Sequence, residues 1–178
     1  MSSNKCIIPE CYIDSCLIEV LLFADKDHVN HQKGNGTVAR EMKGKFGDAF
    51  CVGIIDEDRK ALDYLMEFKP LITTSHLKLW QHKESAHYII QLRPVVEKWI
   101  LNICEREGIL LTEFDLPVTL NQLQKVSKSV TSKNDARFIR LFKYILHTKS
   151  EPVLQLKGWL EYLKKNTFKV DINYLING

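Results

Sequence analysis

The sequence predicts an α/β fold in which a mostly parallel sheet flanked by helices is followed by a helical extension. Over about the first hundred residues, short apolar segments alternate with stretches of helical periodicity, as in βαβ units. Residues 49–55 form a continuous apolar run, which is typical of a strand buried on both faces of a parallel sheet. Beyond residue 110 the apolar spacing is helical only. We therefore expect an α/β domain over residues 1–110 and a helical extension over residues 111–178.

The first elements follow from apolar spacing and from proline and glycine. Residues 5–9 predict a short buried strand that ends at Pro9. Residues 12–24 place their apolar side chains on one helical face. Residues 25–36 are polar and predict a loop, and residues 37–46 predict a short helix.

The rest of the chain is assigned by the same rules. After the strand at 49–55, the pattern predicts a helix over 61–68, strands over 76–82 and 87–92, and a helix that runs from Pro94 to Gly108. Two further helical stripes, over 138–146 and 153–163, fall in the extension.

Composition places the chain among globular proteins. It has 178 residues, of which 45% are hydrophobic and 26% charged, and this length suits one well-buried core. No apolar stretch reaches the length of a membrane span and no signal-peptide pattern opens the sequence, so we expect a cytoplasmic location and no membrane partner. The five cysteines are odd in number and lack zinc-binding spacing, which predicts reduced thiols.

Charge is distributed unevenly along the chain. The net charge is +3, but residues 1–110 are slightly acidic and residues 111–178 carry 11 Lys and Arg against 6 Asp and Glu. A basic helical segment beside an acidic site suits a polyanionic substrate. Solvated helix faces are the alternative explanation.

Carboxylates follow two predicted strands. Glu10 comes after the first strand, and Asp56 and Asp58 come directly after the apolar strand. In open α/β sheets, ligands bind beyond the carboxyl ends of the strands. Clustered carboxylates repel one another, and a Mg²⁺ or Mn²⁺ ion relieves that repulsion. The alternative is that Asp56 caps a following helix and that Asp58 interacts with its dipole.

The order of these motifs resembles the Toprim domain, a Rossmann-like domain of topoisomerases, bacterial primases and related nucleases. The matching segments are Ile7-Ile-Pro-Glu10 and Phe50-Cys-Val-Gly-Ile-Ile-Asp-Glu-Asp58. The resemblance implies that Glu10 is a general acid/base or third metal ligand and that Asp56 and Asp58 bind Mg²⁺. The segment Pro94-Val-Val-Glu97-Lys-Trp99 is similar to one in compact Toprim-like proteins of phage defence, which implies that Glu97 is an additional acidic group.

The chain also departs from the Toprim pattern. Cys11 stands where the family usually has glycine, and the strand that normally follows the first helix is not evident. Asp14, one helical turn beyond Glu10, is a candidate substitute ligand. Cys11 itself, at the expected start of a helix, is a candidate nucleophile of lowered pKa.

Two hypotheses follow. The first is a Mg²⁺-dependent phosphoryl-transfer protein acting on nucleic acid, most plausibly a nuclease. Its candidate phosphate contacts are Arg59, Lys60, Lys125, Lys128, Lys133, Arg137 and Arg140. The second is a catalytically degenerate Toprim-like binding or regulatory module, for example in a phage-defence system. A small-molecule enzyme that uses the glycine-rich segment from Lys33 to Thr37 ranks third. The oligomeric state stays open, and a homodimer is compatible with the sequence.

Overall fold

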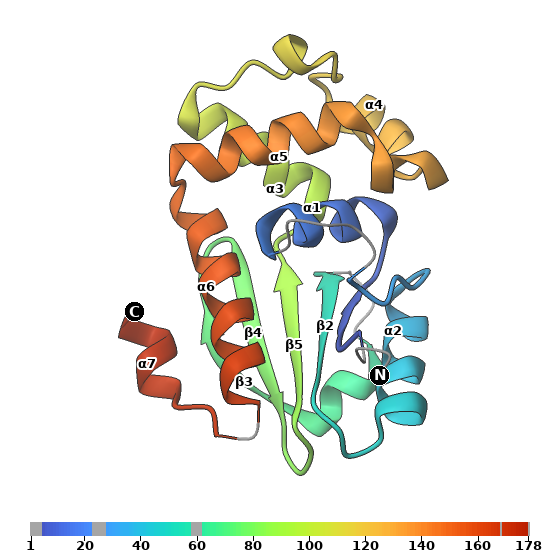
Figure 1. The fold of residues 1–178 in the computed structure, drawn as a ribbon, viewed down its shortest axis with the longest axis vertical. Helices are drawn as coiled ribbons and strands as arrows, with labels where there is room; N and C mark the ends of the chain where they lie inside the picture. The colour runs from blue at the N-terminus through green and yellow to red at the C-terminus, as the bar shows by residue number, and fades with distance from the viewer. Residues whose placement is uncertain (1–4, 23–27, 58–61, 168, 178) are drawn as a thin grey trace.

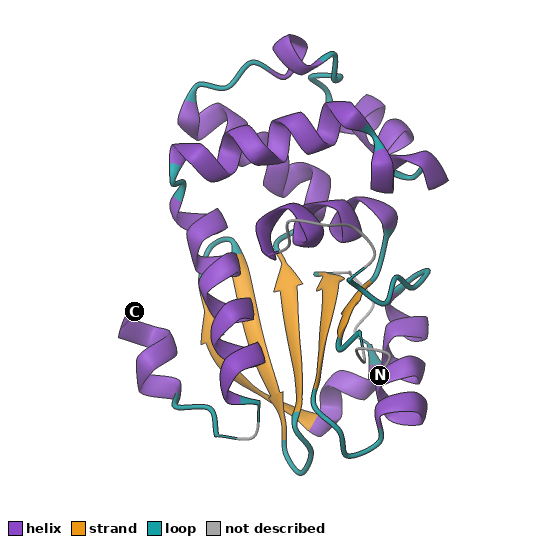
Figure 2. Ribbon diagram, viewed as in Figure 1, coloured by secondary structure: helices purple, strands orange, loops and turns teal. Residues whose placement is uncertain are grey.

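The computed structural model describes residues 5–22, 28–57, 62–167 and 169–177. A five-stranded sheet lies between helices, so the predicted α/β class is confirmed (Figures 1 and 2). The strands are β1 (Ile7–Pro9), β2 (Cys51–Asp56), β3 (Phe68–Thr73), β4 (Leu77–His82) and β5 (His87–Leu92). Their order across the sheet is β1-β2-β5-β4-β3.

The sheet is mixed rather than mostly parallel. β1, β2 and β5 run parallel, whereas β4 pairs antiparallel with both β5 and β3. The connections from β3 to β4 and from β4 to β5 are a few residues long, and such short connections join only antiparallel neighbours. The parallel strands β2 and β5 are separated in the chain by β3 and β4, which extend the sheet beyond β5.

The segment over residues 30–34 runs beside β1, although it contains no regular strand. The amides of Asn30, Gln32 and Gly34 donate to the carbonyls of Ile7, Pro9 and Glu10, at 2.8, 2.9 and 3.0 Å. Part of the loop predicted over 25–36 thus supplies β1 with hydrogen-bond partners on its outer edge.

The helices agree with the sequence pattern at most positions. They are α1 (Tyr12–Leu22), α2 (Asn35–Glu41), α3 (Val96–Glu107), α4 (Leu120–Ser127), α5 (Ala136–Thr148), α6 (Glu151–Asn166) and α7 (Ile172–Asn177). A π-helical turn, η1 (Met42–Phe46), continues α2, and short 3-10 turns are η2 (Asp63–Glu67), η3 (Leu111–Phe114) and η4 (Val130–Asn134). The helix predicted over 61–68 is wrong, because η2 passes directly into β3.

Hydrophobic clusters cover the two faces of the sheet. One cluster joins alternate side chains of β2, β4 and β5 to α1, α3, α5 and α6. The other joins the opposite side chains to α2, η1 and η2. At Gly53 the second layer approaches closely, since a Cβ there would lie 2.9 Å from the Met42 sulfur. Any larger residue at this position would therefore push α2 and η1 away from β2.

Helix α1 links the sheet to the C-terminal helices. It lies across the ends toward which β2 and β5 point, and it also contacts α5 and η4 (Figure 1). The first hydrophobic cluster accordingly runs from Ile7 to Leu175. Within the described ranges, no helix combines the length and apolarity needed to cross a bilayer.

Candidate active site

The carboxyl ends of the three parallel strands bring acidic residues together. Glu10 follows β1, Asp56 ends β2, and Glu97 lies in the first turn of α3, just after β5. Because these strands are neighbours in the order β1-β2-β5, the three residues lie at one edge of the sheet. Ligands of open α/β sheets bind at such an edge.

Backbone amides hold two of these carboxylates in place. The amide of Asp56 donates to Glu10 Oε2 at 3.0 Å. The amide of Val96 donates to Asp56 Oδ1 at 2.8 Å. Val96 is the first residue of α3, so Asp56 satisfies an otherwise unpaired amide at the start of that helix. Asp56 therefore caps α3 across the sheet, and not a helix that directly follows β2.

Asp14 is the most unusual member of the cluster. It lies in the first turn of α1, its side chain is completely buried, and neither carboxylate oxygen has a hydrogen-bond partner. Burial raises its pKa to about 8; the Cys11 thiol nearby opposes this shift, and the charges of Glu10 and Glu97 add to it. A buried carboxylate without partners is costly, so this side chain is either protonated or compensated by a ligand.

The pKa of Asp56 is raised as well. Burial raises its pKa to about 9, and repulsion from Asp14 and Glu10 contributes, while the hydrogen bond from Val96 opposes the shift. Burial and mutual repulsion thus favour the protonated forms of these carboxyl groups when no cation is bound. A divalent ion would displace these protons, because carboxylates ligate in their ionised form.

Glu97 connects the cluster to the helical extension. Its side chain is buried, and it accepts a hydrogen bond from the hydroxyl of Ser127 at the end of α4. Ser132 in turn donates from Oγ to the carbonyl of Ser127 at 2.6 Å. The extension therefore contributes directly to the surroundings of the carboxylates.

A cavity of about 560 Å³ opens at this edge of the sheet. Glu10, Asp56 and Glu97 line it together with two cations, Lys33 and Lys128. The acidic groups can hold a cation, while the lysines attract an anion. A phosphate bridged to a divalent ion satisfies both requirements.

An aromatic pair forms another part of the lining. The rings of Tyr12 and His31 stack with centroids 4.0 Å apart. Ser15 Oγ donates to the Cys11 carbonyl at 2.9 Å, so its oxygen accepts from His31 Nδ1 at 3.1 Å. His31 is therefore the Nδ1–H tautomer, and its Nε2 is a buried acceptor without a partner. Burial lowers the pKa of His31, which keeps the ring neutral at pH 7.

The candidate nucleophile at Cys11 is not supported. Burial, followed by the charge of Asp14, raises the pKa of the Cys11 thiol far above its ordinary value. A thiol in these surroundings stays protonated and is a poor nucleophile.

The structure describes some of the predicted metal ligands but not all of them. Among the described residues, no three His, Cys, Asp or Glu side chains are arranged to hold one ion. Asp58, Arg59 and Lys60, which were predicted as a metal ligand and two phosphate contacts, lie outside the described residues. The oxygens of Asp14 are of the type that a hard cation accepts as ligands, but Asp14 does not line the cavity described above.

The predicted phosphate contacts separate into two groups. Lys128 lines the cavity, and Lys125 is exposed on α4. The other three form ion pairs with neighbouring acids: Lys133 with Glu19 at 3.6 Å, Arg137 with Asp135 at 2.7 Å and Arg140 with Asp115 at 3.0 Å. Of this group, Lys128 alone is placed against the carboxylates by the cavity.

Sequence reasoning did not assign Lys33 or Ser127 to the site. Lys33 begins the glycine-rich segment that was noted as a weaker phosphate loop, and Gly34 beside it also lines the cavity. For Ser127 the sequence holds no comparable signal, because its approach depends on the packing of α4 against α3.

Comparisons with protein-family models, with curated proteins and with solved structures find no match for this chain.

Proposed function

We propose that this protein is a Mg²⁺- or Mn²⁺-dependent phosphoryl-transfer protein that acts on nucleic acid, and more narrowly a nuclease with a Toprim-like core. The observation that carries the proposal is Asp14, a fully buried carboxylate whose nearest polar groups are the Cys11 thiol and amide and whose charged neighbours, Glu10 and Glu97, are also carboxylates. Proteins rarely bury an acidic cluster unless a cation neutralises it.

The carboxylates near the strand ends are the proposed ligands of such an ion, although in the described residues they are not yet arranged around one point. Glu10, Asp14, Asp56 and Glu97 would hold it, with Asp58 as the further ligand that the resemblance implies. The bound ion would offset the carboxylate charges and polarise a phosphoryl oxygen. Asp56 is oriented for this task because the amide of Val96 fixes one of its oxygens.

The remaining groups act on the substrate. Lys33 and Lys128 would bind phosphate oxygens at the mouth of the cavity, where their charge also offsets that of the cluster. Glu10, which accepts the Asp56 amide through Oε2, would exchange a proton with the attacking or leaving oxygen.

A second candidate, a non-catalytic Toprim-like binding or regulatory module, is favoured by a different observation. Glu10, Asp56 and Glu97 each already accept a hydrogen bond from the protein, from Asp56, Val96 and Ser127 respectively. Such bonds stabilise the fold and do not require a metal.

Manganese titration followed by electron paramagnetic resonance separates the two candidates. We expect saturable Mn²⁺ binding by the wild type at pH 8.5, weakened on the order of 100-fold in Asp56→Asn and Glu10→Gln. Asp63→Asn, an exposed carboxylate in η2, is the matched control and keeps full affinity. Cleavage of single- or double-stranded DNA or RNA that requires Mn²⁺ would support the nuclease.

The other outcomes are equally informative. Binding without cleavage of any nucleic acid would favour the non-catalytic module. If Mn²⁺ does not bind even in the presence of an oligonucleotide, or if both variants bind as the wild type does, the acidic cluster is not a metal site.

A further inference from the structure

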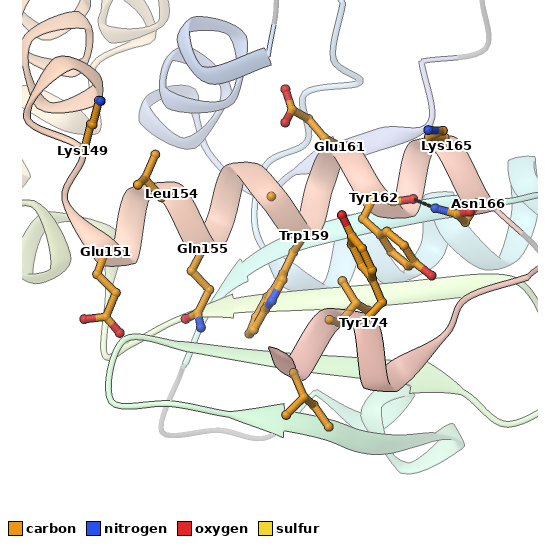
Figure 3. Close-up of a pocket in the computed structure, with 13 residues that line it drawn as sticks. Lys149, Glu151, Leu154, Gln155, Trp159, Glu161, Tyr162, Lys165, Asn166 and Tyr174 are labelled. Atoms are coloured by element: carbon orange, nitrogen blue, oxygen red, sulfur yellow. Dashed lines mark hydrogen bonds between the residues drawn. The ribbon is translucent and has the colours of Figure 1, made fainter. Parts of the chain in front are cut away.

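The outer face of α6 carries a groove that is remote in sequence from the acidic cluster. The groove has a volume of about 670 Å³ and lies between α6 and α7 (Figure 3). Leu154 on α6 and Tyr174 and Ile176 on α7 line it, and these side chains are 44%, 60% and 57% exposed. Large apolar side chains gathered at one concave surface indicate a binding partner.

Gly158 lies at the middle of this face. A Cβ added there would meet no atom within 4 Å, so nothing inside the chain requires a glycine at this position. Glycine in a helix interior costs roughly 1 kcal/mol relative to alanine. The close approach of a backbone from another chain would explain a glycine at this position, because glycine permits close packing where two helices cross.

The residues around Gly158 are arranged so that the face is complementary to itself. Glu151 and Lys165 stand seven positions before and after Gly158, and Leu154 and Tyr162 stand four positions before and after it. At about 100° per residue, all four lie within about 40° of Gly158 around the helix axis. All of them line the groove.

A two-fold axis through Gly158 would therefore pair unlike groups. In an antiparallel crossing of two copies of α6, each Glu151 faces the partner's Lys165, and each Leu154 faces the partner's Tyr162. The two glycines meet at the centre, where the absence of side chains permits close packing. A symmetric interface must match its own surface in this way.

The charges present on the monomer agree with this pairing. Glu151 is 68% exposed and already binds Arg106 at 3.1 Å, so the partner's Lys165 would extend an existing ion pair. Tyr162 is held in place because its hydroxyl accepts the Asp171 amide at 2.9 Å and its ring stacks on Tyr174, with centroids 4.5 Å apart.

We infer that the protein forms a homodimer in which two copies of α6 cross antiparallel at Gly158, with the groove between α6 and α7 as the interface. The partner is a second copy of this chain, recognised by the Glu151–Lys165 charge pairing and by the Leu154–Tyr162 apolar contact. This inference is independent of the proposed catalytic function.

Sedimentation velocity from about 1 to about 100 µM protein tests the inference. The wild type should shift from monomer to dimer, and Gly158→Leu should raise the dimer Kd by about 100-fold or more, because the added side chain separates the backbones. Gly44→Leu is the matched control, since a Cβ there also meets nothing within 4 Å, and it should leave the Kd unchanged.

Charge reversal tests the pairing itself. Glu151→Lys and Lys165→Glu should each weaken the dimer about tenfold or more, and the double variant should restore it, because the pairing is then merely inverted. In addition, Gly158→Cys should form a disulfide across the axis under mild oxidation, whereas Val118→Cys, an exposed control on another surface, should not.

A wild type that is monomeric over the whole range would overturn the inference. A dimer that withstands Gly158→Leu, or that forms no cross-link through Gly158→Cys, would use another surface and would overturn it as well. Circular dichroism of each variant excludes unfolding as the cause of dissociation, and Gly158→Leu should be no less helical than the wild type because leucine favours helix.

Discussion

The acidic cluster and the helical extension differ in how their charged side chains are neutralised. At the sheet edge, Asp14 is buried and Asp56 half-buried among other carboxylates, and their pKa values are raised to about 8 and about 9. In the extension, Arg137 and Arg140 are paired at the surface with Asp135 and Asp115. Asp14 and Asp56 have no ion pair among the contacts described, whereas these two arginines are neutralised by neighbouring carboxylates.

This difference makes the acidic cluster the better candidate for a ligand site. Exposed ion pairs such as Arg140–Asp115 are nearly neutral units that contribute roughly 0–1 kcal/mol to stability. Asp14 and Asp56 form no ion pair among the contacts described, and burial together with mutual repulsion favours their protonated forms. The net basic composition of the extension is thus less informative about a candidate site than the placement of a few buried acids.

The largest effect is expected at Asp14. Asp14→Asn should lower Mn²⁺ affinity on the order of 100-fold. The same change should raise the free energy of unfolding at pH 9 in chelator by on the order of 2 kcal/mol, because it removes a buried charge. Metal titration and chemical denaturation measure the two quantities.

The matched control lies in the other region. Asp115→Asn makes the same chemical change at a side chain that is 76% exposed, and it should alter stability by no more than about 0.5 kcal/mol. If Asp14→Asn lowered the free energy of unfolding as well as the Mn²⁺ affinity, Asp14 would be a structural residue. The proposed difference between the acidic cluster and the extension would then be contradicted.

The second effect is a dependence of stability on pH. The pKa values of Asp14 and Asp56 are higher in the folded protein than the unfolded value of 3.8, so folding favours their protonated forms. Their contribution to stability is present at low pH and is lost as pH rises through the folded pKa values of about 8 and about 9. In chelator, the free energy of unfolding should fall between pH 6.5 and 9, by at most about 1.4 kcal/mol per pH unit for each group.

Other titrating groups act at the margins of this window or outside it, and the raised pKa values of the thiols of Cys6, Cys11, Cys51 and Cys104 add to the decline near its upper end. His31 and His87 have lowered pKa values and affect stability below pH 6.5, and the lowered pKa of Asp135 acts below pH 3.8. Saturating Mg²⁺ should reverse the decline, because it binds the ionised carboxylates. A flat profile in chelator would show that the two carboxyl groups are not held protonated.

The smallest expected effect concerns the salt dependence of nucleic-acid binding and the basic side chains that contribute to it. Lys33→Gln and Lys128→Gln should each reduce the salt dependence of nucleic-acid binding by about one unit of slope in log Kd against log salt concentration. Arg140→Gln should change the slope less, because that side chain already binds Asp115. Fluorescence anisotropy at several salt concentrations measures the slopes, and equal changes in all three variants would show that the cavity has no special role.

Much of the fold was predictable because buried elements carry strong periodic signals. The continuous apolar run that forms β2 and the helical stripes of α5 and α6 were predicted near their observed bounds. The strand β3 was missed because it lies at the sheet edge, where Lys69, Pro70 and Thr73 are exposed and no alternation marks it. Met66, which suggested a helical face, is 79% exposed.

Of the candidate site, only the residues that lie at the ends of strands could be predicted. Glu10 and Asp56 could be placed together because carboxyl ends of neighbouring parallel strands meet at one edge. The full burial of Asp14, the contact between Ser127 and Glu97, and the approach of Lys128 depend on how α1 and α4 pack, which no local pattern encodes. The Toprim-like assignment itself stays a prediction.

The position of α1 has a consequence for synthesis on the ribosome. This helix leaves the exit tunnel early, but α5 and η4, which cover it, belong to the last third of the chain. Translation adds about 5–20 residues per second, so α1 lacks its packing partners α5 and η4 until those later segments have been synthesised. Throughout that interval Asp14 stays hydrated with the ordinary acidity of an aspartate. The burial of Asp14 is thus reached only after α5 and η4 have been synthesised.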